Sequence, residues 1–201
     1  MTPASGSGAV DRVRDAAIST APTAQRILDA ATAEFAERGL AGARVDRIAQ
    51  RAAANKQRLY AYFGSKEELF DRVVEAGIGE LLDAVQFDAD DLPGYAARLY
   101  AFNRAHPELV RLMQWHNLER PGRLADLPDS SGATAAKIDA LRSAQQRGPG
   151  RVDPTVPADR LLTQVLALVH GATLTAGLSA LDDDVMRTDL VRSVERIVAP
   201  G

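Results

Sequence analysis

Apolar residues recur at intervals of three and four along most of this 201-residue chain, and this helical spacing is the feature that most constrains its fold. Ile27, Ala31 and Phe35 repeat every four residues, and Gly39 then supplies a stop. Later apolar runs keep the same period near residues 95–105, 107–119, 132–147, 157–180 and 183–198. No segment alternates β-branched and polar residues between hairpin turns, as strands would require. We therefore predict an all-α protein of about nine helices.

Two of the expected helices are short and closely joined. The first carries Val45, Ile48 and Ala52 on its inner face, the stretch "AAAN" follows, and the next helix starts near Asn55. This layout is that of a helix-turn-helix, whose second helix enters the major groove of DNA with its first residues against base edges. The sequence therefore predicts a DNA-binding module in this part of the chain.

The start of that second helix carries polar side chains that can read bases. In "NKQRLYAYF", Asn55 can cap the helix with its side-chain oxygen. Lys56, Gln57 and Arg58 form the leading turn. Glutamine can pair with adenine, and arginine or lysine with guanine. These four residues are predicted to lie at the DNA.

The rest of the segment divides between the core and the DNA backbone. Leu59 and Phe63, four residues apart, share one face and are expected to anchor the helix. Tyr60 and Tyr62 lie off that face, where a phenol can donate to a phosphate. Lys66 opens the next helix, beside backbone amides that already favour an anion. All three polar side chains are predicted to contact DNA.

The charge distribution supports this assignment. The whole chain has a net charge of −3, which by itself argues against nucleic acid. Residues 44–66, however, carry six basic side chains and a single acidic one, Asp46. A local basic window on an acidic body is expected of a small DNA-contacting surface.

Residues 24–75 resemble the DNA-binding domain of the TetR (tetracycline repressor) family of transcriptional regulators. The pieces "ILDAATAEFAERG", "IAQRA", "LYAYF" and "SKEELF" match in order and spacing. The resemblance implies an N-terminal helix-turn-helix domain with a third supporting helix. It further implies a C-terminal helical domain that binds a small-molecule effector and forms a homodimer through its last two long helices. Repression as the default activity rests on this resemblance alone.

Three departures from the family pattern bear on DNA binding. Ala43 and Arg44 stand where a hydroxyl usually caps the second helix, and Arg44 can restore a phosphate contact through its charge. Ala53 replaces the usual glycine of the turn, so a turn that is not left-handed is expected here. Gln57 and Arg58 replace a pair of small residues, so base preference does not carry over.

The chain is expected to divide into three parts. Residues 1–22 are predicted to be a mobile tail, residues 23–66 the helix-turn-helix domain, and residues 67–201 the effector-binding and dimerisation domain. Residues 161–178 are apolar nearly all round, which suits a helix buried on both sides. With the apolar stripe of the last helix, this pattern favours a four-helix interface between two copies.

An effector pocket is predicted in the two helices that follow the fourth. Aromatic and polar side chains gather there, and a small apolar or aromatic molecule is expected to bind near Phe102, Met113, Trp115 and His116. Such a ligand would release the protein from a palindromic operator in double-stranded DNA.

Two other classes of protein remain as alternatives. A DNA-binding regulator without an effector would have a solid body in place of a hollow one. A helical-bundle enzyme would need motifs that are absent: G-x-S-x-G, a P-loop, H-E-x-x-H, or the paired Glu-x-x-His of di-metal bundles. We therefore predict a protein that is not an enzyme and needs no metal or cofactor. With no apolar run of about 18 residues and no signal peptide, it is expected in the cytoplasm and not in a membrane.

Overall fold

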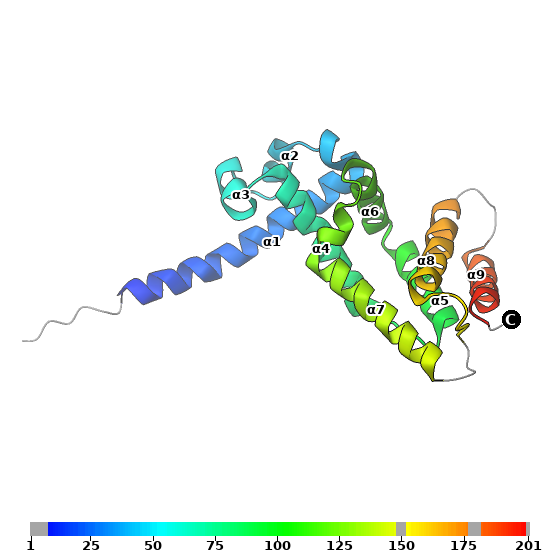
Figure 1. Ribbon diagram of the computed structural model, residues 1–201. Helices are drawn as coiled ribbons and strands as arrows, with labels where there is room; N and C mark the ends of the chain where they lie inside the picture. Colours follow the sequence, from blue (N-terminus) through cyan, green and yellow to red (C-terminus); the bar gives the residue numbers. More distant parts are fainter. Residues whose placement is uncertain (1–7, 148–151, 177–181, 200–201) are drawn as a thin grey trace, which may run out of the picture. The chain divides into compact units, whose positions relative to one another are not determined.

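The computed structural model describes residues 8–147, 152–176 and 182–199, and every regular element within these ranges is helical (Figure 1). The first four helices are α1 (Gly8–Gly42), α2 (Val45–Arg51), α3 (Lys56–Phe63) and α4 (Lys66–Ala84). The next are α5 (Leu92–Ala105), α6 (Pro107–Glu119) and the short 3₁₀ helix η1 (Arg123–Asp126). The last three are α7 (Pro128–Gln146), α8 (Ala158–Thr175) and α9 (Asp183–Val198). The prediction of an all-α protein with about nine helices is confirmed.

Helix α1 begins earlier than the sequence led us to expect. A tail was predicted over residues 1–22, whereas the helix already runs from Gly8 and continues through Pro22. Residues 9–21 are rich in alanine and contain neither glycine nor proline, so nothing in them interrupts a helix. The part of the predicted tail before Gly8 lies outside the described residues.

The helices form two compact units. The first unit comprises residues 1–74 and 111–121, and the second comprises residues 75–110 and 122–201. The expected boundary at residue 66 therefore differs from the structural one. The first turns of α4 and the C-terminal part of α6 pack with the helix-turn-helix, because their apolar side chains complete its core.

Aromatic and aliphatic side chains from five helices fill the first unit. Phe35 of α1 meets Phe70 of α4 edge to face, with ring centroids 4.9 Å apart. Ile48, Leu59 and Leu112 are fully or almost fully buried and come from α2, α3 and α6. Burial of such side chains is worth roughly 1.5–3 kcal/mol each, so this core holds α2 and α3 in place.

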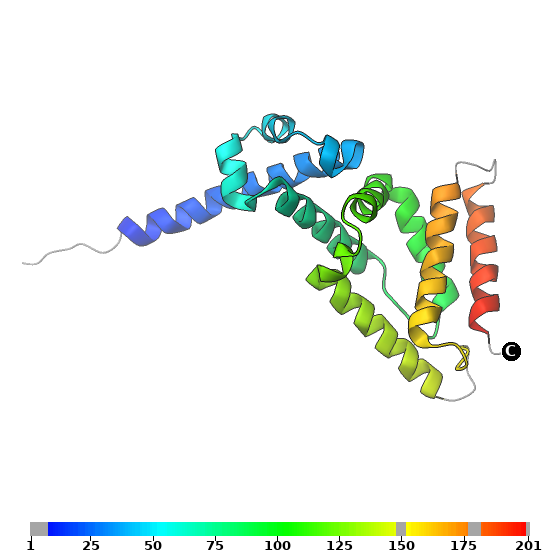
Figure 2. The ribbon, with the colours of Figure 1, turned by 45° about the horizontal axis from the view of Figure 1, so that its top comes forward.

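The second unit is built around α5, α7, α8 and α9. Its core includes the buried side chains Tyr95, Leu141, Leu161, Val165 and Val194. Helices α8 and α9 run side by side in opposite directions in both views (Figure 2). Among the described helices, none combines the length and apolarity that crossing a membrane would demand.

Candidate nucleic-acid interface

The turn between α2 and α3 is left-handed at Ala53, where φ is 48°. The expectation of another conformation at this alanine is wrong. The N–H of Ala53 donates to the carbonyl of Gln50 at 3.2 Å, and the N–H of Ala54 donates to that of Ala49 at 2.9 Å. This pair of bonds is the Schellman motif, which requires a left-handed residue after the helix end. The two hydrogen bonds at the end of α2 therefore offset the cost of placing alanine there.

The start of α3 is capped and open to solvent. The side chain of Asn55 accepts the N–H of Arg58 at 2.8 Å, as expected for an N-cap. Gln57 and Arg58 are exposed on the first turn, and Tyr60 remains 44% exposed on the next. These side chains are therefore accessible at the end of α3 that a helix-turn-helix presents to base edges.

Lys56 is held by a carboxylate whose role could not be predicted from the sequence. Its Nζ lies 2.7 Å from Oδ1 of Asp46, in the first turn of α2. This hydrogen bond and the charge of Asp46 raise the pKa of Lys56. Because both side chains are at least half exposed, the pair is worth little in stability, and a phosphate can replace Asp46 as the partner.

Lys66 lies beside the start of α2. Its Nζ is 3.4 Å from the carbonyl oxygen of Ala43, next to the exposed Arg44 at the N-cap of α2. Together with the Asp46–Lys56 pair, this contact brings the starts of α2, α3 and α4 onto one surface. The residues predicted to bind DNA at these three helix starts therefore lie close together.

The two anchors of α3 differ in depth. Leu59 is completely buried, whereas Phe63 is half-buried and packs edge to face with Tyr62, their centroids 6.2 Å apart. Tyr62 is itself half-buried, so its ring is less accessible than that of Tyr60. A capping box opens α4: the Ser65 hydroxyl accepts the N–H of Glu68, and the Glu68 carboxylate accepts the N–H of Ser65.

A buried carboxylate of α1 that was not predicted supports α2. Glu34 of α1 is fully buried and accepts Nε of Arg47 at 2.7 Å and the backbone N–H of Arg44 at 3.1 Å. Burial works to raise its pKa, but the hydrogen bonds and the charges of Arg47 and Arg51 outweigh it, so the pKa lies below its ordinary value. Glu34 stands seven residues after Ile27, on the apolar stripe, and an acid in that position was the available signal.

The four residues predicted to bind an effector are divided between the units. Met113 and Trp115 are half-buried in the first unit, where His116 is completely buried and stacks on Phe70 at 5.8 Å. Phe102 belongs to the second unit, where it stacks on His106 at 4.1 Å. The four therefore do not form one site within either unit.

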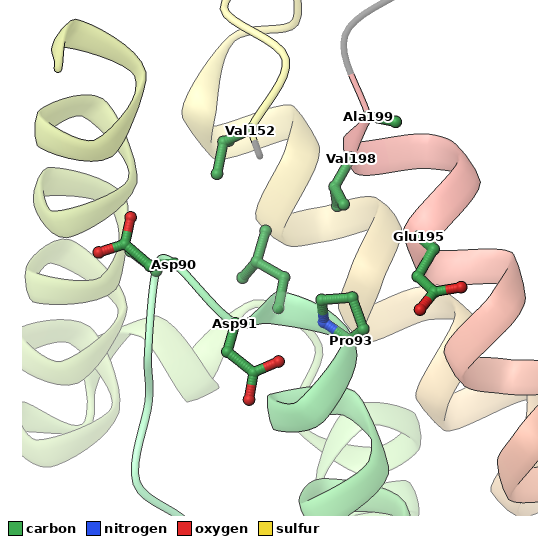
Figure 3. A pocket seen from close by; sticks show the side chains of 9 residues that line it. Asp90, Asp91, Pro93, Val152, Glu195, Val198 and Ala199 are labelled. Atoms are coloured by element: carbon green, nitrogen blue, oxygen red, sulfur yellow. The ribbon is translucent and has the colours of Figure 1, made fainter. Parts of the chain in front are cut away.

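The second unit contains a hollow of about 330 Å³ at another place (Figure 3). Its lining residues are Ala89, Asp90, Asp91, Leu92, Pro93, Val152, Glu195, Val198 and Ala199. Two of its carboxylates are engaged within the fold: Asp90 pairs with Arg147 at 2.6 Å, and Asp91 caps α5 at the N–H of Gly94. The hollow thus combines apolar side chains with an acidic mouth.

The polar residues that could have served a metal are spread over separate contacts. Nε2 of His106 lies 3.5 Å from Glu80, and Glu119 accepts backbone N–H groups of α1. Within the part of the chain that the structure describes, no three His, Asp or Glu side chains gather closely enough to hold a metal ion.

Comparison with known proteins identifies both halves of the chain. Residues 27–73 match the family described as bacterial regulatory proteins, tetR family, and residues 91–199 match the tetracyclin repressor-like C-terminal domain. The second match alone spans more than half of the chain.

Relatives align over most of the chain. It is 38% identical to the HTH-type transcriptional repressor SCO4008 of Streptomyces coelicolor, over 88% of this chain and 95% of that protein. It is 28% identical to the HTH-type transcriptional repressor NicS of Pseudomonas putida, over 78% of this chain and 73% of that protein. The crystal structure of SCO4942 from S. coelicolor superposes with a TM-score of 0.77 at 36% identity, covering 89% of this chain and 99% of that one.

Proposed function

The chain belongs to the TetR family of transcriptional regulators, and from this membership we propose that it is a repressor that binds a palindromic operator as a homodimer and is released by a small molecule. The observation that carries the proposal is the exposed first turn of α3, which presents Gln57 and Arg58 within a basic surface. The relatives SCO4008 and NicS are described as repressors, which supports repression as the default activity. Such a protein acts in the cytoplasm, where its operator is accessible.

Different side chains of this surface have different roles in the proposal. Gln57 and Arg58 read base edges, whereas Arg44, Tyr60 and Lys66 contact the sugar-phosphate backbone. Lys56 leaves Asp46 and pairs with a phosphate or a guanine. Asn55 caps α3 and lies beside the backbone, and Tyr62 supports Tyr60 from the partly buried side.

The exposed face of α8 supports the dimer. Ala167, His170, Gly171 and Leu174 follow one another at helical spacing and are all exposed in the single chain. A Cβ added at Gly171 would meet nothing within 4 Å, so a second helix has room to approach there. Two copies that pack through α8 and α9 bring two α3 helices to the two halves of a palindrome.

DNase footprinting on the upstream region of its own gene is the direct test. We expect protection of a two-fold symmetric site. In binding assays, Arg58→Ala and Gln57→Ala should alter base preference, with a cost of about 1–3 kcal/mol at the affected base pair. Lys66→Ala should weaken binding to all sequences and lower the salt slope by about one. Arg142→Ala, on α7 of the second unit, serves as the charge control and should change neither quantity.

The outcomes separate the parts of the proposal. A folded dimer that protects no site refutes operator binding. Loss of base preference from Lys66→Ala, with none from Arg58→Ala, refutes the assignment of roles. In a deletion strain the neighbouring transcripts should rise, and a fall would show an activator.

The effector is proposed to be a small apolar or aromatic molecule that binds in the second unit near Phe102, one of the four residues expected at the site from the sequence. Since Trp115 and His116 pack within the first unit, Phe102 is the residue whose change tests the site most cleanly. Phe102→Ala should raise the concentration of ligand needed to release the operator by about tenfold, as expected for loss of one buried aromatic contact. An unchanged concentration would place the effector elsewhere, and the same assay on Val152→Phe, which fills the hollow of Figure 3, would then test that location.

A further inference from the structure

Helix α1 is interrupted just before the helix-turn-helix. Gly39 has φ 68° and ψ −178°, a conformation that other residues adopt only with strain. A new helical turn starts after it, shown by the hydrogen bond from the N–H of Ala43 to the carbonyl of Gly39 at 3.2 Å. The N–H groups at the start of such a turn have no acceptor within the helix and need one from outside.

Glu119, the last residue of α6, supplies that acceptor from almost 80 positions away in the sequence. Its carboxylate accepts the N–H of Leu40 at 2.5 Å and that of Ala41 at 3.2 Å. A carboxylate at the first N–H groups of a helix accepts charge-assisted hydrogen bonds, and the positive end of the helix dipole stabilises its negative charge. Glu119 therefore acts as the cap of this turn.

Trp115, one turn earlier on α6, covers the backbone at the interruption. A Cβ placed on Gly39 would lie 2.8 Å from Cε3 of Trp115 and 2.9 Å from an oxygen of Glu119, closer than real Cβ atoms approach. The indole ring thus rests directly on the glycine. Both contacts lie within the first unit.

The segment from Gly39 to Arg44 is also held at its C-terminal end. Lys66 contacts the carbonyl of Ala43, and Glu34 accepts the N–H of Arg44, where α2 begins. The chain from Gly39 to Arg44 is the only covalent link through which α1 sets the direction of α2. The turn that Glu119 caps therefore lies within the segment that leads from α1 into α2.

We propose that Glu119 is a positioning residue for DNA binding: with Trp115 against Gly39, its carboxylate fixes the turn that orients the helix-turn-helix. This inference rests on the proposed function, and it assigns to the end of α6 a task in the DNA-binding unit. Glu119 touches neither base nor phosphate in this scheme and acts only through the backbone of Leu40 and Ala41.

The negative charge of Glu119 and a positioning role for it have opposite effects on DNA binding, so an experiment can separate them. Removal of a negative charge from a protein near DNA should strengthen binding, because the remaining basic groups are less opposed. If Glu119 positions α2, its removal should weaken binding despite the lost negative charge. Glu108 offers the matched control, because it is an exposed glutamate on the same helix.

The experiment compares Glu119→Ala, Glu119→Gln, Glu108→Ala and Glu108→Gln on one duplex that the wild-type protein selects from a random library. Fluorescence anisotropy should show about tenfold weaker binding for Glu119→Ala, the loss expected for a charged hydrogen-bonding group. Glu119→Gln keeps one acceptor oxygen, so its affinity for the duplex should lie between those of the wild type and Glu119→Ala. The salt slope should stay unchanged, because no phosphate contact is removed. The Glu108 variants should match the wild type or bind slightly more tightly.

Amide hydrogen exchange gives a second readout that does not depend on DNA. In Glu119→Ala the N–H groups of Leu40 and Ala41 should exchange about tenfold faster, while those of α8 and α9 keep their wild-type rates. Faster exchange at both amides with unchanged or tighter DNA binding overturns the positioning role. Unchanged exchange overturns the cap itself. If Glu119→Ala fails to fold, the Gln variant decides by the same two measurements.

Failure of the wild-type protein to select any duplex would refute the proposed function. The exchange rates at Leu40 and Ala41 would then still decide whether Glu119 caps the turn, so the two failures are distinguishable.

Discussion

Ala53 adopts a left-handed backbone conformation that alanine rarely takes. Among the described residues it is the one non-glycine with a positive φ, and the Schellman hydrogen bonds of α2 hold it there. Left-handed alanine costs about 1–2 kcal/mol, whereas glycine in the unfolded chain costs about 0.5–1 kcal/mol of entropy. Ala53→Gly should therefore stabilise the protein by up to about 1 kcal/mol, as measured by urea unfolding.

The neighbouring alanine is the control. Ala54 has no positive φ, so Ala54→Gly gains nothing from relief of strain and should lose about 0.5–1 kcal/mol. Equal losses from both substitutions would show that the turn is not left-handed in solution.

At the scale of elements, α2 depends on Glu34 of α1. Folding favours the ionised form of this buried carboxylate, because Arg47 and the N–H of Arg44 lower its pKa against the effect of burial. Its stabilisation is therefore present above the pKa of the unfolded chain and is lost as pH falls through the lower pKa of the folded state. Glu34→Gln should cost about 1.5–3 kcal/mol at pH 7, the range for hydrogen bonds to charged groups.

Urea unfolding at a series of pH values tests this dependence. The difference between wild type and Glu34→Gln should shrink as the medium is acidified below the ordinary pKa of glutamate. Glu37→Gln is the control on the same helix: its carboxylate is 52% exposed and pairs with Arg38, so the change should stay within about 0.5 kcal/mol. A Glu34→Gln variant that matches this control at pH 7 would contradict the supporting role.

Most elements could be predicted from the sequence because their signals are local. Helix α3 starts after its cap Asn55, α4 after the capping box of Ser65 and Glu68, and α6 at Pro107. The spacing of apolar residues marks the buried face of each helix. The start of α1 was not predicted, because the glycines and prolines near it suggested a tail. The interruption at Gly39 was expected only as a stop, since its partners on α6 lie far along the chain.

At the scale of the whole molecule, the exposed residues of the candidate site could be predicted from the sequence. The contacts between side chains on different helices could not. The exposure of Gln57 and Arg58 follows from the period of α3. The Asp46–Lys56 pair and the Glu119 cap join residues on different helices, and nothing in a single sequence signals such pairing. For the same reason the sequence grouped Phe102 with Trp115, although the two belong to different units.

The proposed dimer makes a prediction that involves both copies. Leu174 is 55% exposed on α8 and ends the stripe that begins at Ala167, so a second copy would bury it. Leu174→Glu places a charge in that apolar contact and should shift sedimentation from dimer to monomer, since burial of an unpaired charge costs several kcal/mol. The monomer can occupy only one half of a palindrome, so operator affinity should fall by at least about a hundredfold while binding to a single half-site persists.

Leu118→Glu provides the comparison, because Leu118 is 74% exposed on α6, outside α8 and α9. It should leave the sedimentation of the dimer unchanged. If both variants remain dimeric, the two copies associate through another surface. That surface then determines the distance between the two α3 helices. If Leu174→Glu alone becomes monomeric yet protects both halves of the operator with wild-type affinity, each copy reads its half-site independently, and dimerisation contributes nothing to DNA binding.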